Sequence, residues 1–209
     1  MKSIREYLTA LKEFISGDKM QIITGKYRGR KLVSLDTKKT RPTLARVKES
    51  LFSMVDEKIA GATVLDLFAG SGALGIEALS RGAEKVYFVD NNVDAKKVIQ
   101  TNLRNVKENF DIEICDFKNA LDKFCQLGVK FDIVFLDPPY QSDFGDVAIR
   151  LLDEKHLLLE ESVVCFEYQG ENHLQSVPKC YKILKSKRYA DKMLTILEYG
   201  SNGRHNTTY

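Results

Sequence analysis

The segment Val64-Leu65-Asp66-Leu67-Phe68-Ala69-Gly70-Ser71-Gly72-Ala73-Leu74-Gly75 reads as a buried strand that turns on glycines into a helix. Glycine is needed in such a turn because a bound ligand lies against bare backbone and because the turn uses dihedral angles that a side chain disfavours. Gly70, Gly72 and Gly75 also have the spacing of the dinucleotide fingerprint. The segment therefore predicts a nucleotide-binding α/β domain, but it does not distinguish NAD from S-adenosylmethionine.

Strands and helices alternate after this segment. Strands are expected over 64–68, 85–90, 111–115, 131–136 and 162–168, with a terminal hairpin of 182–189 and 193–199. Helices are expected over 72–80, 93–107, 118–127 and 147–152. Because apolar strands alternate with helices, the pattern predicts an α/β fold with a mostly parallel sheet and helices on both faces.

The residues ahead of this core predict a basic appendage. Residues 1–19 have apolar side chains at helical spacing and predict a short N-terminal extension helix. The strand-like runs 21–25 and 30–34 surround a turn with glycine and arginine and predict a small β-hairpin, which we expect to present basic side chains and no core. A helix is expected from an N-cap at Thr43 to about Lys58. The expected division is an extension (1–19), a basic nucleic-acid-binding hairpin and helix (20–60), a catalytic domain (61–200) and a flexible tail (201–209).

The net charge of +3 conceals two basic clusters. Between Met20 and Lys48, nine lysines and arginines stand against one acid, Asp36, and the five between Lys179 and Arg188 have no acid among them. Clustered charge of this kind is typical of a surface that binds polyanions, with a solvated lysine-rich surface as the alternative. Two clusters around a nucleotide-binding core favour nucleic acid as the partner.

The composition limits the other classes of protein. With 209 residues, 44% of them hydrophobic, the chain can bury one substantial core. No apolar stretch approaches the roughly eighteen residues of a membrane helix, and the N-terminus lacks the pattern of a secretory signal. The four cysteines have no metal-binding spacing with one another or with the histidines. We therefore expect buried reduced thiols, no metal, no membrane and a cytoplasmic location.

Three aspartates stand at the ends of consecutive expected strands, Asp66, Asp90 and Asp116. The carboxyl ends of parallel strands line the crevice where open α/β sheets bind ligands, which favours one site over three separate strand-end caps. A carboxylate at Asp66 suits the ammonium and sulfonium groups of S-adenosylmethionine, Asp90 suits ribose hydroxyls, and Asp116 suits the adenine amino group. The expected cofactor-binding residues are Asp66, Phe68, Ala69, Gly70, Ser71, Gly72, Asp90, Asn91, Asp116 and Phe117.

The segment Asp137-Pro138-Pro139-Tyr140 follows the fourth expected strand and indicates the reaction. An exocyclic amine of a base is a poor nucleophile because its lone pair is delocalised into the ring. The Asp137 carboxylate and the Pro138 carbonyl can each accept one amine N–H, which draws the nitrogen toward tetrahedral geometry, while Pro139 helps to stiffen the loop. Tyr140 can stack on the base, and Asp137 needs only a hydrogen bond to receive the proton. These four catalytic residues predict methylation of an amino group.

Together these motifs resemble the RsmD family, bacterial methyltransferases that modify the N2 amino group of a guanine in 16S ribosomal RNA. The resemblance spans Met20 to about Tyr199 and rests most specifically on the segments 23–32, 41–43 and 46–52. Residues 189–192 read Tyr-Ala-Asp-Lys where the family tends to carry a Tyr-Gly-Asp-Thr-like segment. No role is therefore assigned to Ala190 or Lys192.

The resemblance implies a seven-stranded Rossmann-like class I methyltransferase sheet with one antiparallel strand. It also implies S-adenosylmethionine as donor, S-adenosylhomocysteine as product, and 16S ribosomal RNA in an assembling small subunit as partner. The hairpin and the loop at Arg41 would approach the active site and guide RNA into it, and the target guanine would leave its stack to reach Asp137. The expected RNA-binding residues, chiefly for phosphates, are Lys26, Arg28, Arg30, Arg41, Thr43, Arg46 and Arg188.

Other functions remain as alternatives. A DNA amino-methyltransferase acting on adenine N6 or cytosine N4 shares the Asp-Pro-Pro-Tyr segment, but it usually carries a separate target-recognition domain. A protein-amide methyltransferase usually has Asn at the position of Asp137. A catalytically inactive RNA-binding assembly factor has no need of the four aspartates, and an NAD-dependent enzyme is distinguished by cofactor binding.

Overall fold

The computed structural model describes residues 20–35, 42–139, 142–170, 174 and 177–200, and for residues 42–45 it describes the backbone. The expected helix in residues 1–19, the tail of residues 201–209, Arg41 and Tyr140 lie outside the described residues. Within the described part of the chain, no helix is long and apolar enough to cross a membrane.

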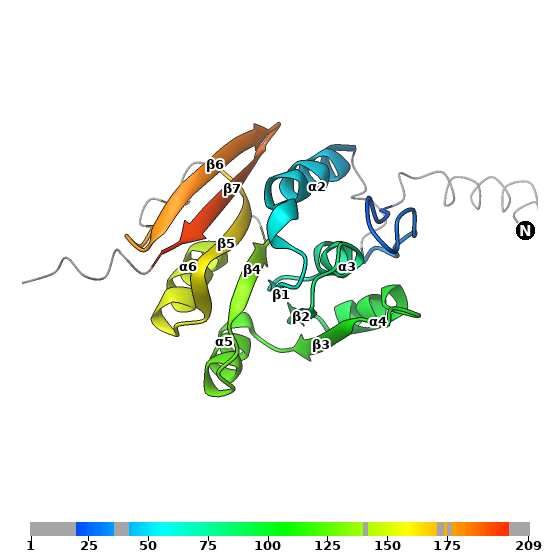
Figure 1. The fold of residues 1–209 in the computed structure, drawn as a ribbon, viewed down its shortest axis with the longest axis horizontal. Coiled ribbons are helices and arrows are strands. Elements are labelled where there is room, and N and C mark those ends of the chain that lie inside the picture. Colours follow the sequence, from blue (N-terminus) through cyan, green and yellow to red (C-terminus); the bar gives the residue numbers. More distant parts are fainter. Residues whose placement is uncertain (1–19, 36–41, 140–141, 171–173, 175–176, 201–209) are drawn as a thin grey trace, which may run out of the picture.

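A seven-stranded sheet in the order β3-β2-β1-β4-β5-β7-β6 forms the framework (Figure 1). The strands are β1 (Thr63–Asp66), β2 (Lys85–Asp90), β3 (Asn109–Ile114), β4 (Phe131–Leu136), β5 (Leu158–Gln169), β6 (Tyr181–Tyr189) and β7 (Lys192–Tyr199). The pairs from β3 to β5 are parallel, whereas β7 is antiparallel to both of its neighbours. The expected mostly parallel seven-stranded sheet is confirmed. We call the edge where β1 to β5 end the carboxyl edge, and the opposite one the amino edge.

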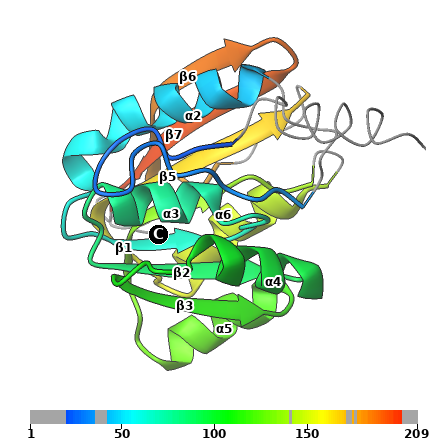
Figure 2. The same cartoon turned by 90° about the vertical axis from the view of Figure 1, so that its right-hand side faces the viewer.

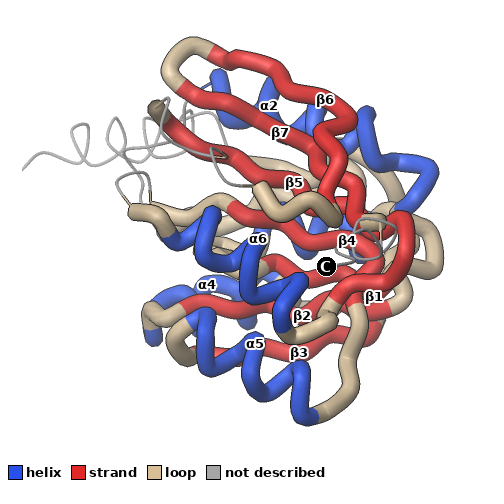
Figure 3. Tube along the Cα trace, turned by 90° about the vertical axis from the view of Figure 1, so that its left-hand side faces the viewer, coloured by secondary structure: helices blue, strands red, loops and turns tan. Residues whose placement is uncertain are grey.

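Helices cover both faces of the sheet (Figures 2 and 3). One face, here called the α2 face, packs against α2 (Pro42–Val55), α3 (Ala73–Ser80) and α4 (Val93–Asn102), and the short helix η1 (Asp56–Lys58) follows α2. The other, the α5 face, packs against α5 (Phe117–Gln126) and α6 (Phe144–Glu154). Side chains of β4 alternate between them, since Phe135 joins the core of the α2 face and Leu136 that of the α5 face.

Several boundaries differ from the sequence prediction. Helix α2 begins at Pro42, so Thr43 lies inside its first turn and is not its N-cap, which agrees with the preference of proline for the first helical position. Helix α4 ends at Asn102, earlier than expected, and the chain then turns through Asn105 at φ 67°. Strand β5 and helix α6 are both longer than expected.

The basic segment before α2 is not a regular hairpin and does contribute to the core. Its two arms share one isolated bridge, Gln21 to Lys31, and form no described strand. Ile22 and Leu32 are 1% and 7% exposed and belong to the same hydrophobic cluster as α2, α3 and the sheet. The expectation that this segment presents basic side chains without a core was wrong, because the many basic residues of the segment obscured two buried positions.

The cysteines are free thiols, as expected, but they are not all buried. Cys165 and Cys180 are buried, Cys115 is partly buried and Cys125 is exposed. Among the described residues, no group of three or more His, Cys, Asp or Glu side chains is arranged to hold a metal ion.

Candidate active site

The predicted site residues meet at the carboxyl edge, where the order of strands reverses. The chain runs from β1 outward to β2 and β3 on one side, and to β4 and β5 on the other. Asp66, the last residue of β1, pairs in register with Phe135 of β4, two residues before Asp137. Ligands of open α/β sheets bind in the crevice at such a switch point.

The glycine loop, residues 67–72, is shaped to receive a ligand. Gly70 and Gly72 have φ values of 54° and 76°, and a Cβ on Gly70 would meet nothing within 4 Å. Gly75 has the opposite role, since a Cβ there would lie 2.3 Å from Cε1 of Phe88. Gly70 therefore leaves open space against bare backbone, whereas Gly75 lets α3 pack closely on β2.

Asp66 lies under the glycine loop. Its side chain is 3% exposed and its Oδ2 accepts a hydrogen bond from the Gly75 N–H at 2.9 Å, inside the first turn of α3. Burial raises the pKa of Asp66 to about 7, and the Gly75 hydrogen bond partly offsets this rise. In this state Asp66 satisfies one of the free N–H groups at the start of α3, and its other oxygen, Oδ1, is a candidate to bind a ligand cation.

Asp90 closes the opposite side of the loop. Its Oδ2 accepts from the Gly70 N–H at 2.7 Å and its Oδ1 from the Asn92 N–H at 2.8 Å. These bonds hold the partly exposed carboxylate beside the open space at Gly70, and each oxygen retains a lone pair for a ribose hydroxyl. Asn91, the adjacent residue, is exposed. The geometry fits a ribose and a backbone-bound ligand at this point.

Asp116 and Phe117 lie at the start of α5. Asp116 is its N-cap and accepts from the Lys118 N–H at 2.8 Å, and the Phe117 ring is 5.4 Å from that of Phe68. Phe144 completes an aromatic cluster, with its ring centroid 5.3 Å from Phe117 and 6.5 Å from Phe68. The sequence prediction missed Phe144, although it opens the helix that follows the Asp-Pro-Pro-Tyr segment. Together the three rings form an apolar group beside the expected adenine position.

The catalytic segment directly follows β4. Pro138 is buried and Pro139 is exposed, while the Ser142 backbone N–H and hydroxyl both donate to the Pro139 carbonyl, at 3.1 and 2.7 Å. The pKa of the Asp137 carboxyl is raised to about 7, mainly by burial and then by the negative charges of Glu167 and Asp66, while Lys192 partly opposes the rise. Asp137 is therefore a carboxyl group that can change its protonation state near neutral pH.

Glu167 and Lys192 were missed by the sequence prediction. Their side chains form an ion pair and are each 11% exposed. Leu136 of β4 pairs with Phe166 of β5, so Asp137 and Glu167 are the next residues on neighbouring strands. Glu167 pairs with Leu194 and Lys192 with Gln169, so the two charged residues are diagonal neighbours whose proximity can be inferred only once the antiparallel register is known.

The expected RNA-binding residues divide between the two edges of the sheet. The turn with Lys26, Arg28 and Arg30 lies at the amino edge, because the Lys26 N–H donates to the Ser80 carbonyl at the end of α3, at 2.8 Å (Figure 2). Lys26 is ion-paired with Glu108, and Arg30 donates to the Arg104 carbonyl. This turn does not approach the catalytic segment, contrary to the guiding role implied by the resemblance.

Two other arginines lie near the carboxyl edge. Lys58, just past the end of α2, contacts Glu161 and Glu198 at the amino edge, so α2 begins at the opposite edge, where Figure 2 also places it. Arg46 is exposed in the second turn of α2, and Arg188 is exposed near the end of β6, which runs parallel to β5. The structure therefore brings Arg46 and Arg188 to the same edge of the sheet as Asp137.

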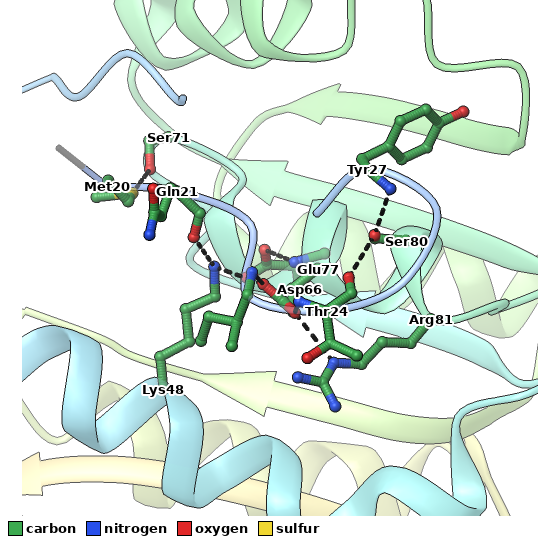
Figure 4. Close-up of polar contacts among 12 residues, drawn as sticks. Met20, Gln21, Thr24, Tyr27, Lys48, Asp66, Ser71, Glu77, Ser80 and Arg81 are labelled. Carbon is green, nitrogen blue, oxygen red and sulfur yellow. Dashed lines mark hydrogen bonds and ion pairs between the residues drawn. The ribbon is translucent and has the colours of Figure 1, made fainter. Parts of the chain in front are cut away.

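A buried polar network fixes the basic segment on α3 (Figure 4). Glu77, fully buried, accepts from the backbone N–H groups of Ile23 and Thr24 at 2.8 and 2.9 Å. It also binds Lys48 at 2.9 Å and Arg81 at 3.0 Å. Lys48, counted above within the basic cluster, is thus a buried structural cation and does not contribute to a polyanion-binding surface.

The strand order, the glycine loop and the carboxylates at the carboxyl edge define a Rossmann-like class I methyltransferase. Comparison with known proteins agrees with this class. The chain belongs to the RsmD family: the family model described as "Conserved hypothetical protein 95" matches residues 20–198.

Relatives and solved structures support this assignment. The chain is 36% identical over 168 residues to Ribosomal RNA small subunit methyltransferase D of Escherichia coli (strain K12), which covers 80% of this chain and 84% of the relative. The solved structure of yhhF from Escherichia coli superposes with a TM-score of 0.78 at 32% identity and covers 87% of this chain and 98% of that one. SMU.776, complexed with SAH, superposes with a TM-score of 0.59 at 16% identity over 73% of this chain and 48% of that one, a likeness of fold alone.

Proposed function

We propose that this chain transfers a methyl group from S-adenosylmethionine to the exocyclic N2 amino group of a guanine in 16S ribosomal RNA, in the cytoplasm, during assembly of the small subunit. The relatives named as small-subunit rRNA methyltransferases support the RNA substrate. The observation that carries the reaction is the position of Asp137, a partly buried carboxyl at the end of β4, beside the crevice of the glycine loop.

The cofactor assignment rests on how the residues fit. Open space at Gly70 suits a ligand that lies against the backbone. The Asp90 carboxylate beside it suits a ribose, and the buried Asp66 suits a cationic methionine moiety. SAH lies in SMU.776, which shares the fold. When bound, S-adenosylmethionine supplies an electrophilic methyl group. We assign Asn91, Asp116, Phe117, Phe68, Ala69, Ser71 and Gly72 to the remainder of this site.

The protein's own groups then act on the amine. The Asp137 carboxylate and the Pro138 carbonyl each accept one N–H of the amino group, which localises the nitrogen lone pair and aims it along the line of attack. As the nitrogen gains the methyl group it becomes acidic, and its proton passes to the Asp137 carboxylate along the hydrogen bond already in place. We assign Tyr140, beyond the described residues, to stacking on the base, and Pro139 to holding the loop through its Ser142 contacts.

We propose separate RNA contacts for the basic residues at the carboxyl edge and at the amino edge of the sheet. Arg46 and Arg188 lie near the catalytic edge and would bind phosphates next to the target nucleotide, together with Arg41 and Thr43. Lys26, Arg28 and Arg30 lie at the amino edge and would contact RNA farther from it. Such contacts give affinity and salt dependence with little sequence information.

The test is to identify the product. Purified protein is incubated with S-adenosylmethionine carrying a labelled methyl group and with unmodified 16S ribosomal RNA, either naked or in small-subunit particles, and the RNA is digested to nucleosides for mass spectrometry. We expect N2-methylguanosine, and none with Asp137→Ala, which should still bind the cofactor in calorimetry. Label in N6-methyladenine, or in DNA offered alongside, would instead favour the DNA amino-methyltransferase, and tight binding of NAD without binding of S-adenosylmethionine would exclude the proposal.

A further inference from the structure

A polar group that the reaction does not yet use lies beside Asp137. Glu167 of β5 and Lys192 at the start of β7 form an ion pair with both side chains 11% exposed. Both charges act on the Asp137 carboxyl, whose pKa is raised to about 7 mainly by burial and next by Glu167, while Lys192 lowers it. The pair is therefore part of the surroundings of the catalytic carboxyl, and its remaining exposure leaves it accessible from the site.

The strand register places these side chains on one face. Phe135, Cys165 and Leu194 all belong to the core of the α2 face. Side chains two residues apart on a strand share a face. Glu167 and Lys192 therefore project to the α2 face, as does Asp137 where it continues the direction of β4.

Tyr189 adds an unsatisfied donor on the same face. It pairs across the β6–β7 ladder with Lys192 and packs against the core of the α2 face. Its hydroxyl is buried and has no hydrogen-bond partner among the described residues. The hydroxyls of Tyr168 and Tyr181, by contrast, bind Thr195 and the Ile149 carbonyl. Buried hydroxyls are nearly always paired, so an unpaired one next to Lys192, on the face that Lys192 shares with Glu167, points to a ligand that binds there.

We propose that Glu167 and Lys192, assisted by the Tyr189 hydroxyl, recognise the Watson–Crick edge of the guanine whose N2 amino group is held at Asp137. This inference rests on the proposed function and identifies the residues that would select guanine as the base to be methylated. Neither the family comparison nor the sequence motifs assigned a role to these three residues.

The hydrogen-bonding groups along the Watson–Crick edge of guanine match the order of these three side chains and Asp137. Guanine presents the N2 amino group, then the N1–H donor, then the O6 acceptor. Asp137 accepts from N2, Glu167 beside it accepts from N1–H, and the Lys192 ammonium, with the Tyr189 hydroxyl, donates to O6. Adenine presents an acceptor at N1 and a donor at its C6 amino group, so it would face Glu167 and Lys192 with the wrong polarity. A site built to pair buried polar groups rejects a base that leaves them unpaired.

The test uses a base that keeps the reacting amine and reverses the rest of the edge. The target guanosine in the RNA substrate is replaced by 2,6-diaminopurine riboside, which retains the 2-amino group but accepts at N1 and donates at C6. For the wild type we expect kcat/KM to favour guanine by about 100-fold. Glu167→Gln and Lys192→Met should each narrow this preference at least tenfold, and Tyr189→Phe less, by about threefold.

Matched controls separate recognition from folding. Tyr168→Phe removes a hydroxyl from the α5 face of the same sheet, and Lys185→Met removes an exposed charge from β6, so both should leave the guanine preference unchanged. Because a single substitution at Glu167 breaks the ion pair with Lys192, the exchange Glu167→Lys with Lys192→Glu keeps an ion pair and reverses its polarity. This double variant should favour diaminopurine over guanine.

The outcomes distinguish this inference from the proposed function. If the variants lower turnover of both substrates by the same factor, and the exchanged pair shows no gain for diaminopurine, then Glu167 and Lys192 hold the fold and do not read the base. If the wild type forms no N2-methylguanosine in the unmodified RNA, the proposed function itself fails.

Discussion

Asp137→Asn should abolish the acid limb of the pH–rate profile without abolishing the reaction. The amide oxygen can still accept one N–H of the target amine, but it cannot ionise near neutral pH. Burial, together with the charges of Glu167 and Asp66, raises the pKa of Asp137 to about 7, and Lys192 partly opposes this rise. The variant therefore separates the ability to hold the amine from the ability to take its proton.

The magnitude follows from the ionised fraction. With a pKa of about 7, only about one tenth of Asp137 is ionised at pH 6, so kcat/KM for RNA should be about tenfold below its plateau there and should rise with unit slope. A carboxyl at the ordinary value of 3.8 would give a flat profile over the same range. Glu167→Gln removes a negative charge and should move the limb to lower pH, whereas Lys192→Met should move it to higher pH.

The assay is kcat/KM for RNA between about pH 5.5 and 9, with the cofactor saturating at every pH. Saturation matters because burial also raises the pKa of Asp66 to about 7, and its ionisation can affect cofactor binding. Asp137→Asn retains Asp66, so any limb that survives in the variant comes from elsewhere. A flat wild-type profile, or a limb of unchanged midpoint in Asp137→Asn, would refute the assignment of Asp137 as the proton acceptor.

Three further predictions concern the scaffold and the RNA. Asp66 has a raised pKa, so the folded protein binds more protons than the unfolded chain between about pH 4 and 7, and stability falls as pH rises through that window. Asp66→Asn keeps an acceptor for the Gly75 N–H and should be more stable than wild type at pH 8, by at most about 4 kcal/mol in denaturant titrations. If the variant's advantage over wild type were no larger at pH 8 than at pH 4, this account of Asp66 would be excluded. Lys48→Met removes one of the two cations that pair with buried Glu77 and should lower the free energy of unfolding by up to about 3–5 kcal/mol. Lys97→Met breaks an ion pair whose side chains are 74% and 70% exposed and should change the free energy of unfolding by less than about 1 kcal/mol. Equal effects of the two substitutions would contradict the buried network. Arg46→Ala and Arg188→Ala should each reduce the slope of log Kd against log salt by about one, and unchanged slopes would mean that these arginines do not contact phosphates.

The parts of the site that could be predicted from the sequence are those formed by residues close together along the chain. A strand followed by glycines and a helix has a local signature, so the loop at Gly70 and the carboxylate at Asp66 could be located from spacing alone. Asp137 could be located for the same reason, because two prolines after an apolar strand are rare. What these residues share is that their geometry depends on neighbours within about ten positions along the chain.

The parts that escaped prediction depend on distant pairings. Lys192 meets Glu167 across 25 residues, through the antiparallel register of β5 and β7. Glu77, within the expected helix 72–80, is buried and accepts hydrogen bonds from backbone N–H groups 54 and 53 positions away. Ile22 and Leu32 lie in a short segment rich in lysine and arginine, which suggests a surface segment until the elements that it packs against are known. No local pattern distinguishes such residues from exposed ones.

The same buried amide supports both the basic segment and the glycine loop. Asn102, 3% exposed at the end of α4, accepts from the Val33 N–H at 2.8 Å and donates to the Val33 and Ser71 carbonyls at 2.9 Å. At the other end of the basic segment, Met20 accepts a hydrogen bond from the Ser71 hydroxyl at 3.3 Å. Both ends of the segment that carries Lys26, Arg28 and Arg30 are therefore linked to Ser71 of the glycine loop. Because Asn102 contacts both segments, the basic segment and the glycine loop are parts of one packed unit. We therefore expect a substitution at Asn102 to disturb the glycine loop and the basic segment together.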